Sequence, residues 1–178
     1  MLTADTFKVN LESERFHLLQ TQPQHFDGLY QVASDPELWA QHPQSDRWKL
    51  DVFKRFFDAG LQNPEGCFTI VDRGSGQVVG STRFYGLDVL EPNIRLGYSF
   101  IARSLWGGAA NQEVKHTQLS FLFKHVNAVY FEIGERNTRS QKALAKFPVE
   151  SYPQDERALA VGNLLYRMSR DAYVEMTN

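Results

Sequence analysis

Cysteine is almost absent from this 178-residue sequence. The single cysteine, Cys67, excludes a disulfide within the chain and a zinc site built from several thiolates. Charge of one sign is also lacking, because 19 Lys and Arg stand against 21 Asp and Glu and leave a formal net charge of −2. Nothing in this balance suggests a basic surface for nucleic acid or for anionic lipid. We therefore expect a cytoplasmic protein that binds neither nucleic acid nor a membrane.

Long hydrophobic runs and linkers are missing as well. The longest uncharged apolar run, "ALAVGNLLY", is too short to cross a bilayer, and the N-terminal segment carries charges where a signal peptide needs an apolar region. No repeat, low-complexity segment or Pro/Gly/Ser-rich linker divides the chain. We expect one domain over residues 1–178, large enough to bury a core, without a metal ion.

Hydrophobic periodicity predicts alternating strands and helices. The predicted strands are 15–22, 66–72, 77–88, 93–102, 128–134 and 162–170, and the predicted helices are 23–35, 49–62, 109–126 and 138–147. The three strands between 66 and 102 predict an antiparallel meander. Strands 93–102 and 128–134 are joined through a helix, which predicts a parallel pair. The fold class is therefore mixed α/β (α+β), with a largely antiparallel sheet and flanking helices.

Two adjacent glycines join a strand to a helix in "RSLWGGAANQEVKHTQL" (103–119). The first N–H groups of a helix lack partners within it and carry partial positive charge, and a glycine turn lets a phosphate approach them. The spacing matches no nucleotide P-loop. The stretch is either a diphosphate cradle or a flexible joint, and Trp106 is either a packing residue or a ligand contact. Further along this helix, Lys115 and His116 are expected at polar positions.

A second helix start lies in "GERNTRSQKALAKF" (134–147), which the predicted sheet sets beside the glycine stretch. Asn137 is either the N-cap of this helix or is left free by a capping box of Thr138 and Gln141. Ser140 is either an ordinary first-turn residue or part of a site. Two helix N-termini are therefore expected to face one cleft.

These stretches resemble the GNAT superfamily of acyl-CoA-dependent N-acyltransferases, in particular the branch of Rim-type ribosomal-protein N-terminal acetyltransferases. The resemblance runs from "LESERFHLL" to "LLYRMSRDAY". Its most specific parts are "LGYSF" followed by "LWGG", and N-x-x-S with a lysine six residues after the serine. It implies a GNAT-like fold in which strands 93–102 and 128–134 splay apart to hold acetyl-CoA, the acyl donor.

The resemblance also implies the roles of individual residues. The backbone of the splayed strand would bond to pantetheine, the glycine loop would bind the diphosphate, and Lys146 would approach the adenosine phosphates. A backbone N–H near Ser99 would stabilise the oxyanion. Ser140 would be the catalytic residue that protonates the thiolate, with Tyr98 and Tyr130 as alternatives. The implied cofactor-binding residues are Phe100, Ile101, Ala102, Trp106, Gly107, Gly108, Ala109, Ala110, Asn111, Asn137 and Lys146.

Three positions depart from the family pattern. Ala109 and Asn111 stand where relatives commonly have a glycine and a small residue, and Arg95 stands where they commonly have a glutamate base. The nearby carboxylates, which the sequence favours as surface residues, are Asp88, Glu91, Glu132 and Glu135. These departures leave a second hypothesis open, in which the protein is an inactive relative that senses an acyl-CoA or another small ligand, or serves as an interaction module.

The expected acceptor is a primary amine, either a protein N-terminal α-amine or a small-molecule amine. At pH 7, deprotonation costs about 1 kcal/mol for an α-amine with a pKa of about 7.7, against about 4.6 kcal/mol for a lysine near 10.4. A site without the usual base therefore favours a weakly basic amine. The acceptor is expected to lie beside residues 33–48, which offer Trp39, His42 and Trp48. A homodimer is one expected assembly.

Overall fold

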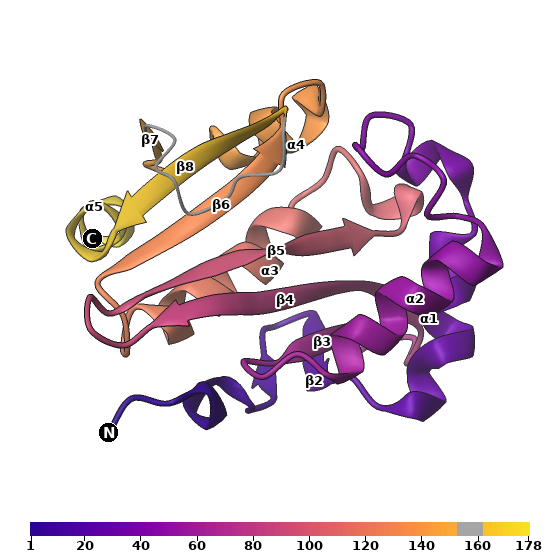
Figure 1. The fold of residues 1–178 in the computed structure, drawn as a ribbon, viewed down its shortest axis with the longest axis horizontal. Coiled ribbons are helices and arrows are strands. Elements are labelled where there is room, and N and C mark those ends of the chain that lie inside the picture. The colour runs from indigo at the N-terminus through magenta and orange to yellow at the C-terminus, as the bar shows by residue number, and fades with distance from the viewer. Residues whose placement is uncertain (153–161) are drawn as a thin grey trace.

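A computed structural model describes residues 1–152 and 162–178. Residues 153–161, which include part of the run "ALAVGNLLY", lie outside the described residues. Within the described ranges, eight strands form one sheet in the order β1-β2-β3-β4-β5-β6-β8-β7 (Figure 1). The strands are β1 (Leu11–Glu12), β2 (Phe16–Gln20), β3 (Cys67–Asp72), β4 (Val78–Asp88), β5 (Asn93–Ile101), β6 (Ala128–Gly134), β7 (Glu150–Tyr152) and β8 (Asn163–Ser169). The helices are α1 (Phe26–Ala33), α2 (Leu50–Leu61), α3 (Ala110–Leu122), α4 (Thr138–Leu144) and α5 (Arg170–Thr177).

The predicted fold class and element order are confirmed, with three additions. The strands β3, β4 and β5 form the antiparallel meander, and β5 and β6 are the parallel pair. The sequence did not predict β1 or β7, which span two and three residues and are too short for alternation to be recognised. It also missed α5, a short helix whose N-cap Ser169 accepts the N–H of Ala172 at 3.2 Å.

The parallel pair is short because β5 and β6 diverge. Residues 93–95 pair with residues 128–130, although both strands continue well beyond this point. The register of β5 against β4 contains one extra residue in β5 beside Tyr98, whose φ is +51°. Such a bulge bends and twists a strand. In Figure 1, β6 accordingly runs away from β5 toward α4, and the predicted splay is present.

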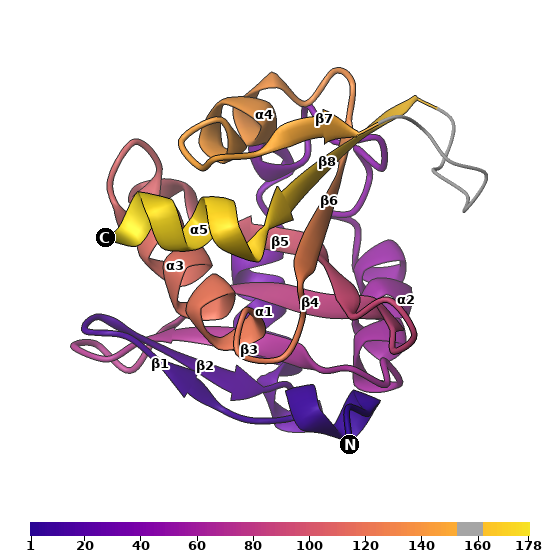
Figure 2. The same ribbon diagram turned by 90° about the vertical axis from the view of Figure 1, so that its left-hand side faces the viewer.

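Helices cover both faces of the sheet. Figure 2 shows α3 and α5 on one face and α2 on the opposite face, where α1 also packs. The apolar core is divided in the same way, with Val114, Leu119 and Tyr173 in the cluster beneath α3 and α5, and Phe53 with Phe100 in the cluster beneath α1 and α2. None of the described helices combines the length and apolar character that crossing a membrane requires.

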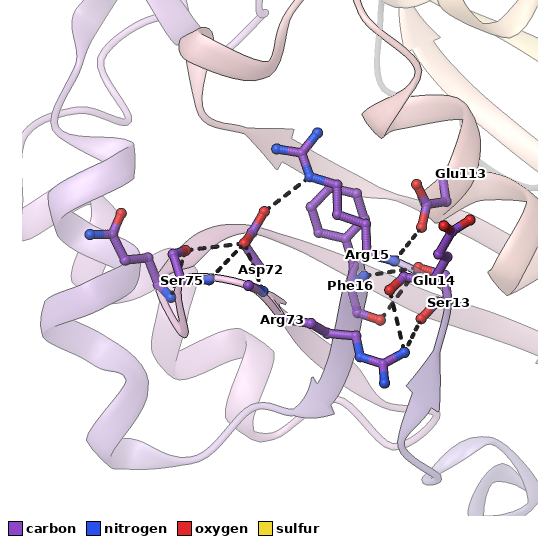
Figure 3. Close-up of polar contacts among 10 residues, drawn as sticks. Ser13, Glu14, Arg15, Phe16, Asp72, Arg73, Ser75 and Glu113 are labelled. Carbon is purple, nitrogen blue, oxygen red and sulfur yellow. Dashed lines mark hydrogen bonds and ion pairs between the residues drawn. The ribbon is translucent and has the colours of Figure 1, made fainter.

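The first turn of α3 is hydrogen-bonded to the residue that precedes β2, which in turn is paired with the end of β3 (Figure 3). The backbone N–H of Arg15 donates to Glu113 Oε1 at 2.8 Å, and Arg15 Nε lies 3.0 Å from Asp72 Oδ2. The N–H of Ser75, in the turn between β3 and β4, donates to Asp72 Oδ1 at 3.0 Å. The Ser75 bond and then the Arg15 guanidinium hold the pKa of Asp72 below its usual value. These contacts fix where the N-terminus of α3 lies relative to the sheet.

Candidate functional site

Two adjoining clefts open where β5 and β6 diverge. The loop cleft, of about 200 Å³, is lined by the glycine loop, the start of α3 and the start of α4. The strand cleft, of about 300 Å³, lies between β5 and β6 and reaches residues 42–47. Both clefts are lined by Ser99, Lys115 and Ser140. The predicted meeting of two helix N-termini at one cleft is therefore observed.

The glycine loop makes its left-handed turn at Gly107, whose φ is +77°. Ala109 has a φ of −79° and a ψ of −11°, which is ordinary helical backbone, so alanine in place of the family glycine brings no strain. The first bond of α3 runs from the N–H of Glu113 to the carbonyl of Ala109 at 2.9 Å. The preceding N–H groups have no partner within the helix. Gly107, Gly108 and Asn111 line the loop cleft, whereas the Ala110 side chain is buried in the core.

Trp106 braces the loop. Its indole Nε1 donates to the carbonyl of Ile101 at 3.1 Å, and the guanidinium of Arg139 lies 3.8 Å above its ring. The N–H of Ala102 donates to the carbonyl of Val79 at 2.7 Å. Two of the backbone groups predicted to bond pantetheine are therefore already engaged within the protein, and Phe100 is largely buried. The cofactor roles of Phe100, Ile101 and Ala102 stay predictions.

Asn137 is the N-cap of α4, which settles the alternative left open by the sequence. Its Oδ1 accepts the N–H of Ser140 at 3.2 Å. The alternative capping box does not form, because Thr138 donates to Gln41 and Gln141 donates to the carbonyls of residues 134 and 135. Within the described part of the chain, Asn137 Nδ2 and the Ser140 hydroxyl have no hydrogen-bond partner. Both side chains line the two clefts and can contact a ligand.

The other residues singled out by the sequence are distributed unevenly. Exposed Lys146 follows α4 and lines the loop cleft. Tyr98 lines the strand cleft, whereas Tyr130 packs 5.3 Å from the ring of Tyr152 and lines neither cleft. On the expected acceptor side, Trp39 lines the loop cleft and His42 lines both, but Trp48 lines neither.

One carboxylate reaches the strand cleft. Among the four nearby acids that the sequence favoured as surface residues, only Glu132 is placed there by the described structure, and its side chain is 13% exposed. Asn163 Nδ2 donates to Glu132 Oε1 at 2.9 Å, and Arg95 Nη1 lies 3.9 Å from Oε2. Arg95, which stands in place of the usual base, thus orients another carboxylate. No group of three or more His, Cys, Asp or Glu among the described residues is arranged to hold a metal ion.

Lys115 is not on a polar surface, contrary to the prediction from its position in α3. It lines both clefts, and its Nζ lies 5.9 Å from the ring centre of Phe131. Burial lowers the pKa of its amine to about 8. The signal in the sequence was the spacing of four from Asn111, which puts both residues on one helix face. His116 also turns inward, with its ring 5.0 Å from that of Phe147.

A buried polar chain connects α3 with the bulged strand. Gln118 Nε2 donates to Thr82 Oγ1 at 3.1 Å, and Thr82 Oγ1 lies 2.8 Å from Ser99 Oγ. Gln118 is 1% exposed. Because buried polar groups are costly without partners, this chain orders the segment of β5 that lines both clefts. Neither Gln118 nor Thr82 was predicted from the sequence to belong to the site.

Comparisons with known proteins agree with this geometry. A family model described as an acetyltransferase (GNAT) domain matches residues 15–148. The solved structure of a GCN5-related N-acetyltransferase from Brucella melitensis has a TM-score of 0.80 at 16% identity, covering 94% of this chain and 81% of that chain. Ribosomal-protein-S5-alanine acetyltransferase from Vibrio fischeri has a TM-score of 0.66 at 13% identity, covering 93% and 98%. Spermidine N-acetyltransferase from Vibrio cholerae, solved with CoA and spermine, has a TM-score of 0.68 at 11% identity, covering 91% and 99%. These identities show a shared fold, and no curated protein sequence matches the chain.

Replacing Lys115 tests its burial. The folded-state pKa of about 8 lies below the unfolded value of 10.5, so the unfolded chain binds more protons between these values and this group adds stability as pH rises through that window. Lys115→Met is expected to raise the free energy of unfolding at pH 7 by about 1–3 kcal/mol and to reduce the gain in stability toward about pH 10. Urea unfolding at both pH values measures this, with exposed Lys124→Met as the control. A less stable Lys115→Met variant with an unchanged pH slope contradicts the prediction.

Proposed function

Because the chain belongs to the GNAT acetyltransferase family, we propose that it transfers an acetyl or other short acyl group from acyl-CoA to a primary amine, at the divergence of β5 and β6. The observation that carries the proposal is the meeting of two helix starts at one cleft, where β5 and β6 cease to pair with each other. The start of α3 offers N–H groups to a diphosphate, and the start of α4 offers Asn137 and Ser140.

The loop cleft is suited to the acyl-CoA. The unstrained backbone at Ala109 keeps the first N–H groups of α3 directed as they would be with glycine there. Arg139 and Lys146 add positive charge to the same cleft, which favours a phosphate-bearing ligand. These features support an intact diphosphate cradle. Because the Ile101 carbonyl already accepts the Trp106 indole, other backbone groups of β5 would bond to pantetheine.

The transfer requires a base, an oxyanion donor and a proton for the thiolate. The amine nitrogen attacks the thioester carbonyl, a C–N bond forms, and the C–S bond breaks. Glu132, held by Arg95 and Asn163, is our candidate for receiving the amine proton. A backbone N–H of β5 near Ser99 would stabilise the oxyanion. The Ser140 hydroxyl would pass a proton to the departing thiolate while taking one from solvent, into which Glu132 releases the amine proton.

Two observations favour this enzyme over an inactive relative. The inactive alternative depended on a loop weakened at Ala109 and on a missing base at Arg95. Ala109 is unstrained, and Arg95 lies beside a carboxylate that reaches the strand cleft. The acceptor we propose is an amine of modest basicity, since Glu132 is already shared with two protein partners.

Gly108→Leu tests the cradle. A Cβ at Gly108 would meet no heavy atom nearer than the Leu105 carbonyl oxygen at 3.9 Å, and Gly108 lines the open loop cleft, so the fold should tolerate a side chain there. The added bulk would obstruct the N–H groups of α3. Calorimetry should give micromolar binding of acetyl-CoA to the wild type and a loss of about ten-fold or more in the variant, at an unchanged unfolding midpoint. No detectable binding to the wild type would remove the proposed cofactor site.

Ser140→Ala tests the proton donor. Asn137 caps the backbone N–H of residue 140 and not its hydroxyl, so α4 should remain folded. We expect kcat to fall by about 10²-fold with little change in KM for acetyl-CoA, as for loss of a general acid. Steady-state kinetics with a confirmed acceptor measures this, with Ser34→Ala in α1's C-cap as the control. Undiminished kcat in Ser140→Ala rules the hydroxyl out as the proton donor.

The acceptor's basicity is tested with two peptides. Acetylation of an N-terminal-alanine peptide should exceed that of an α-blocked lysine peptide by about ten-fold or more in kcat/KM at pH 7, because far more of the α-amine is neutral. The difference should shrink as pH rises toward the lysine pKa. A preference for lysine at pH 7 contradicts the proposed acceptor.

A further inference from the structure

Arg47 is a buried cation for which the described residues provide no ion pair within 4 Å, although the Asp46 carboxylate acts on it at longer range. Its side chain lines the strand cleft, yet the residue is only 4% exposed. The guanidinium lies 5.1 Å from the ring centre of Trp39 and 4.4 Å from that of Phe56, and it donates to the side-chain oxygen of Gln44. Its Nε has no hydrogen-bond partner among residues 1–152 and 162–178. The side chains that contact the guanidinium directly are therefore uncharged, and burial, followed by the charge of Arg83, lowers its pKa to about 10.

The contact between Arg47 and His42 brings two donors together. The Gln44 N–H donates to His42 Nδ1 at 2.9 Å, so the neutral imidazole carries its proton on Nε2. Burial and then the charge of Arg47 lower the pKa of His42 to about 4, which keeps the ring neutral at pH 7. His42 Nε2 lies 3.4 Å from Arg47 Nη1, and both atoms are donors. Neither satisfies the other, and an acceptor oxygen beside them would satisfy both.

A second buried guanidinium stands behind the first. Arg83 is 5% exposed and lies 4.1 Å from the ring centre of Phe56 and 4.9 Å from that of Tyr98. It donates to the Phe56 carbonyl, and its Nε has no partner. A Cβ at Gly60 would meet Arg83 Nη2 at 2.8 Å, so the glycine in α2 leaves room for this cation. Its charge further lowers the pKa of Arg47.

Packing alone does not explain this cluster. Stacking on aromatic rings stabilises the flat faces of the two guanidinium groups. It does not satisfy the buried Nε–H of either arginine, nor the donors of His42 and Arg47 that point toward each other. Buried cations in folded proteins are usually paired with anions, because an unpaired buried charge is costly. An anionic ligand in the strand cleft would offset that cost.

The walls of the strand cleft differ in charge. Arg47 and His42 supply donors on the wall formed by residues 42–47, and Lys115 adds positive charge where the two clefts join. Glu132 lines the same cleft from β6, with Arg95 beside it. A ligand that fits both walls has an amine for Glu132 and oxygen acceptors for Arg47. A polyamine would bring several positive charges next to Arg47 and Lys115.

We propose that the strand cleft selects a small amine that also carries an oxyanion, a carboxylate or a phosphate, and that Arg47 with His42 binds this oxyanion. The inference rests on the proposed acetyl transfer and specifies the acceptor class of the same site. The cleft volume of about 300 Å³ suits a small metabolite. Arg47 is a specificity residue here, because it binds the oxyanion of the acceptor and does not touch the nitrogen that reacts.

Matched pairs of amines test the inference. One pair is L-alanine and L-alaninamide, and the other is O-phosphoethanolamine and ethanolamine, with spermidine as the polycation. Binding is measured by calorimetry on protein saturated with CoA, which under the proposed function occupies the loop cleft. The kcat/KM for each amine is measured with acetyl-CoA and expressed per concentration of neutral amine, because the oxyanion raises the pKa of the amine. In at least one pair, the amine that carries the carboxylate or phosphate should bind about ten-fold more tightly than the amine that lacks it. The pair that shows the preference distinguishes a carboxylate from a phosphate.

The variants separate recognition from folding. Arg47→Gln should bring the ratio of kcat/KM for the amine with the oxyanion to that for the amine without it close to one, mainly through KM. Arg47→Lys should restore part of this ratio. Exposed Arg55, which pairs with Asp51 at 3.3 Å on α2, provides the control Arg55→Gln, which should keep the ratio. If Arg47→Gln does not fold, competition of inorganic phosphate or acetate against the amine in wild-type protein tests the oxyanion site, and the ratio in Arg47→Lys, which should fall below the wild-type value, tests Arg47.

The outcomes distinguish the two proposals. Equal affinity for both members of both pairs, or tightest binding of spermidine, overturns the oxyanion site even if acetyl transfer is observed. Absence of acetyl transfer to every amine overturns the proposed function, whereas the calorimetric ratios still decide whether Arg47 selects an oxyanion. An unchanged ratio in folded Arg47→Gln assigns the preference to another residue and overturns the role of Arg47.

Discussion

The loss of pairing between β5 and β6 is the constraint on which the site depends. Beyond residues 95 and 130 the two strands no longer form a ladder, and the backbone and side chains along the divergence must be satisfied by other groups or by a ligand. The bulge at Tyr98 bends β5 out of register, and the polar chain from Gln118 through Thr82 to Ser99 holds the bent segment in place. The opening is therefore a rigid feature of the sheet, and both clefts form at its edges.

The helices complete what the strands leave open. Helix α3 is held at its start by Glu113 and the backbone of Arg15, which directs its free N–H groups toward the loop cleft. The cap of α4 uses the oxygen of Asn137 and leaves the amide nitrogen of the same side chain for a ligand. Trp106, stacked under Arg139, closes the loop between β5 and α3. In Asn137, one side-chain atom thus stabilises the fold while another remains available to a ligand.

Charge is distributed unevenly across this opening, although the whole chain is nearly neutral. Lys115, Arg47 and Arg83 are buried or half-buried cations, and the facing carboxylate Glu132 is shared with Arg95 and Asn163. Burial lowers the pKa values of Lys115, Arg47 and His42. The folded protein therefore bears the free-energy cost of burying positive charge at this site, which is typical of functional sites. A net charge counted over 178 residues cannot reveal such an arrangement.

The sequence by itself determined the order of the main elements, the parallel β5–β6 connection and the meeting of two helix starts, because these follow from local periodicity, glycine turns and the handedness of crossovers. It also identified the family through local motifs. Only the tertiary structure decided that Gly107 and not Ala109 makes the left-handed turn, and that Asn137 is the cap. The same holds for Lys115, Glu132 and Arg47, which local patterns favour as surface or loop residues. Their burial is set by the divergence of two strands and by segments distant in sequence, and a pattern of near neighbours carries no information about those distances.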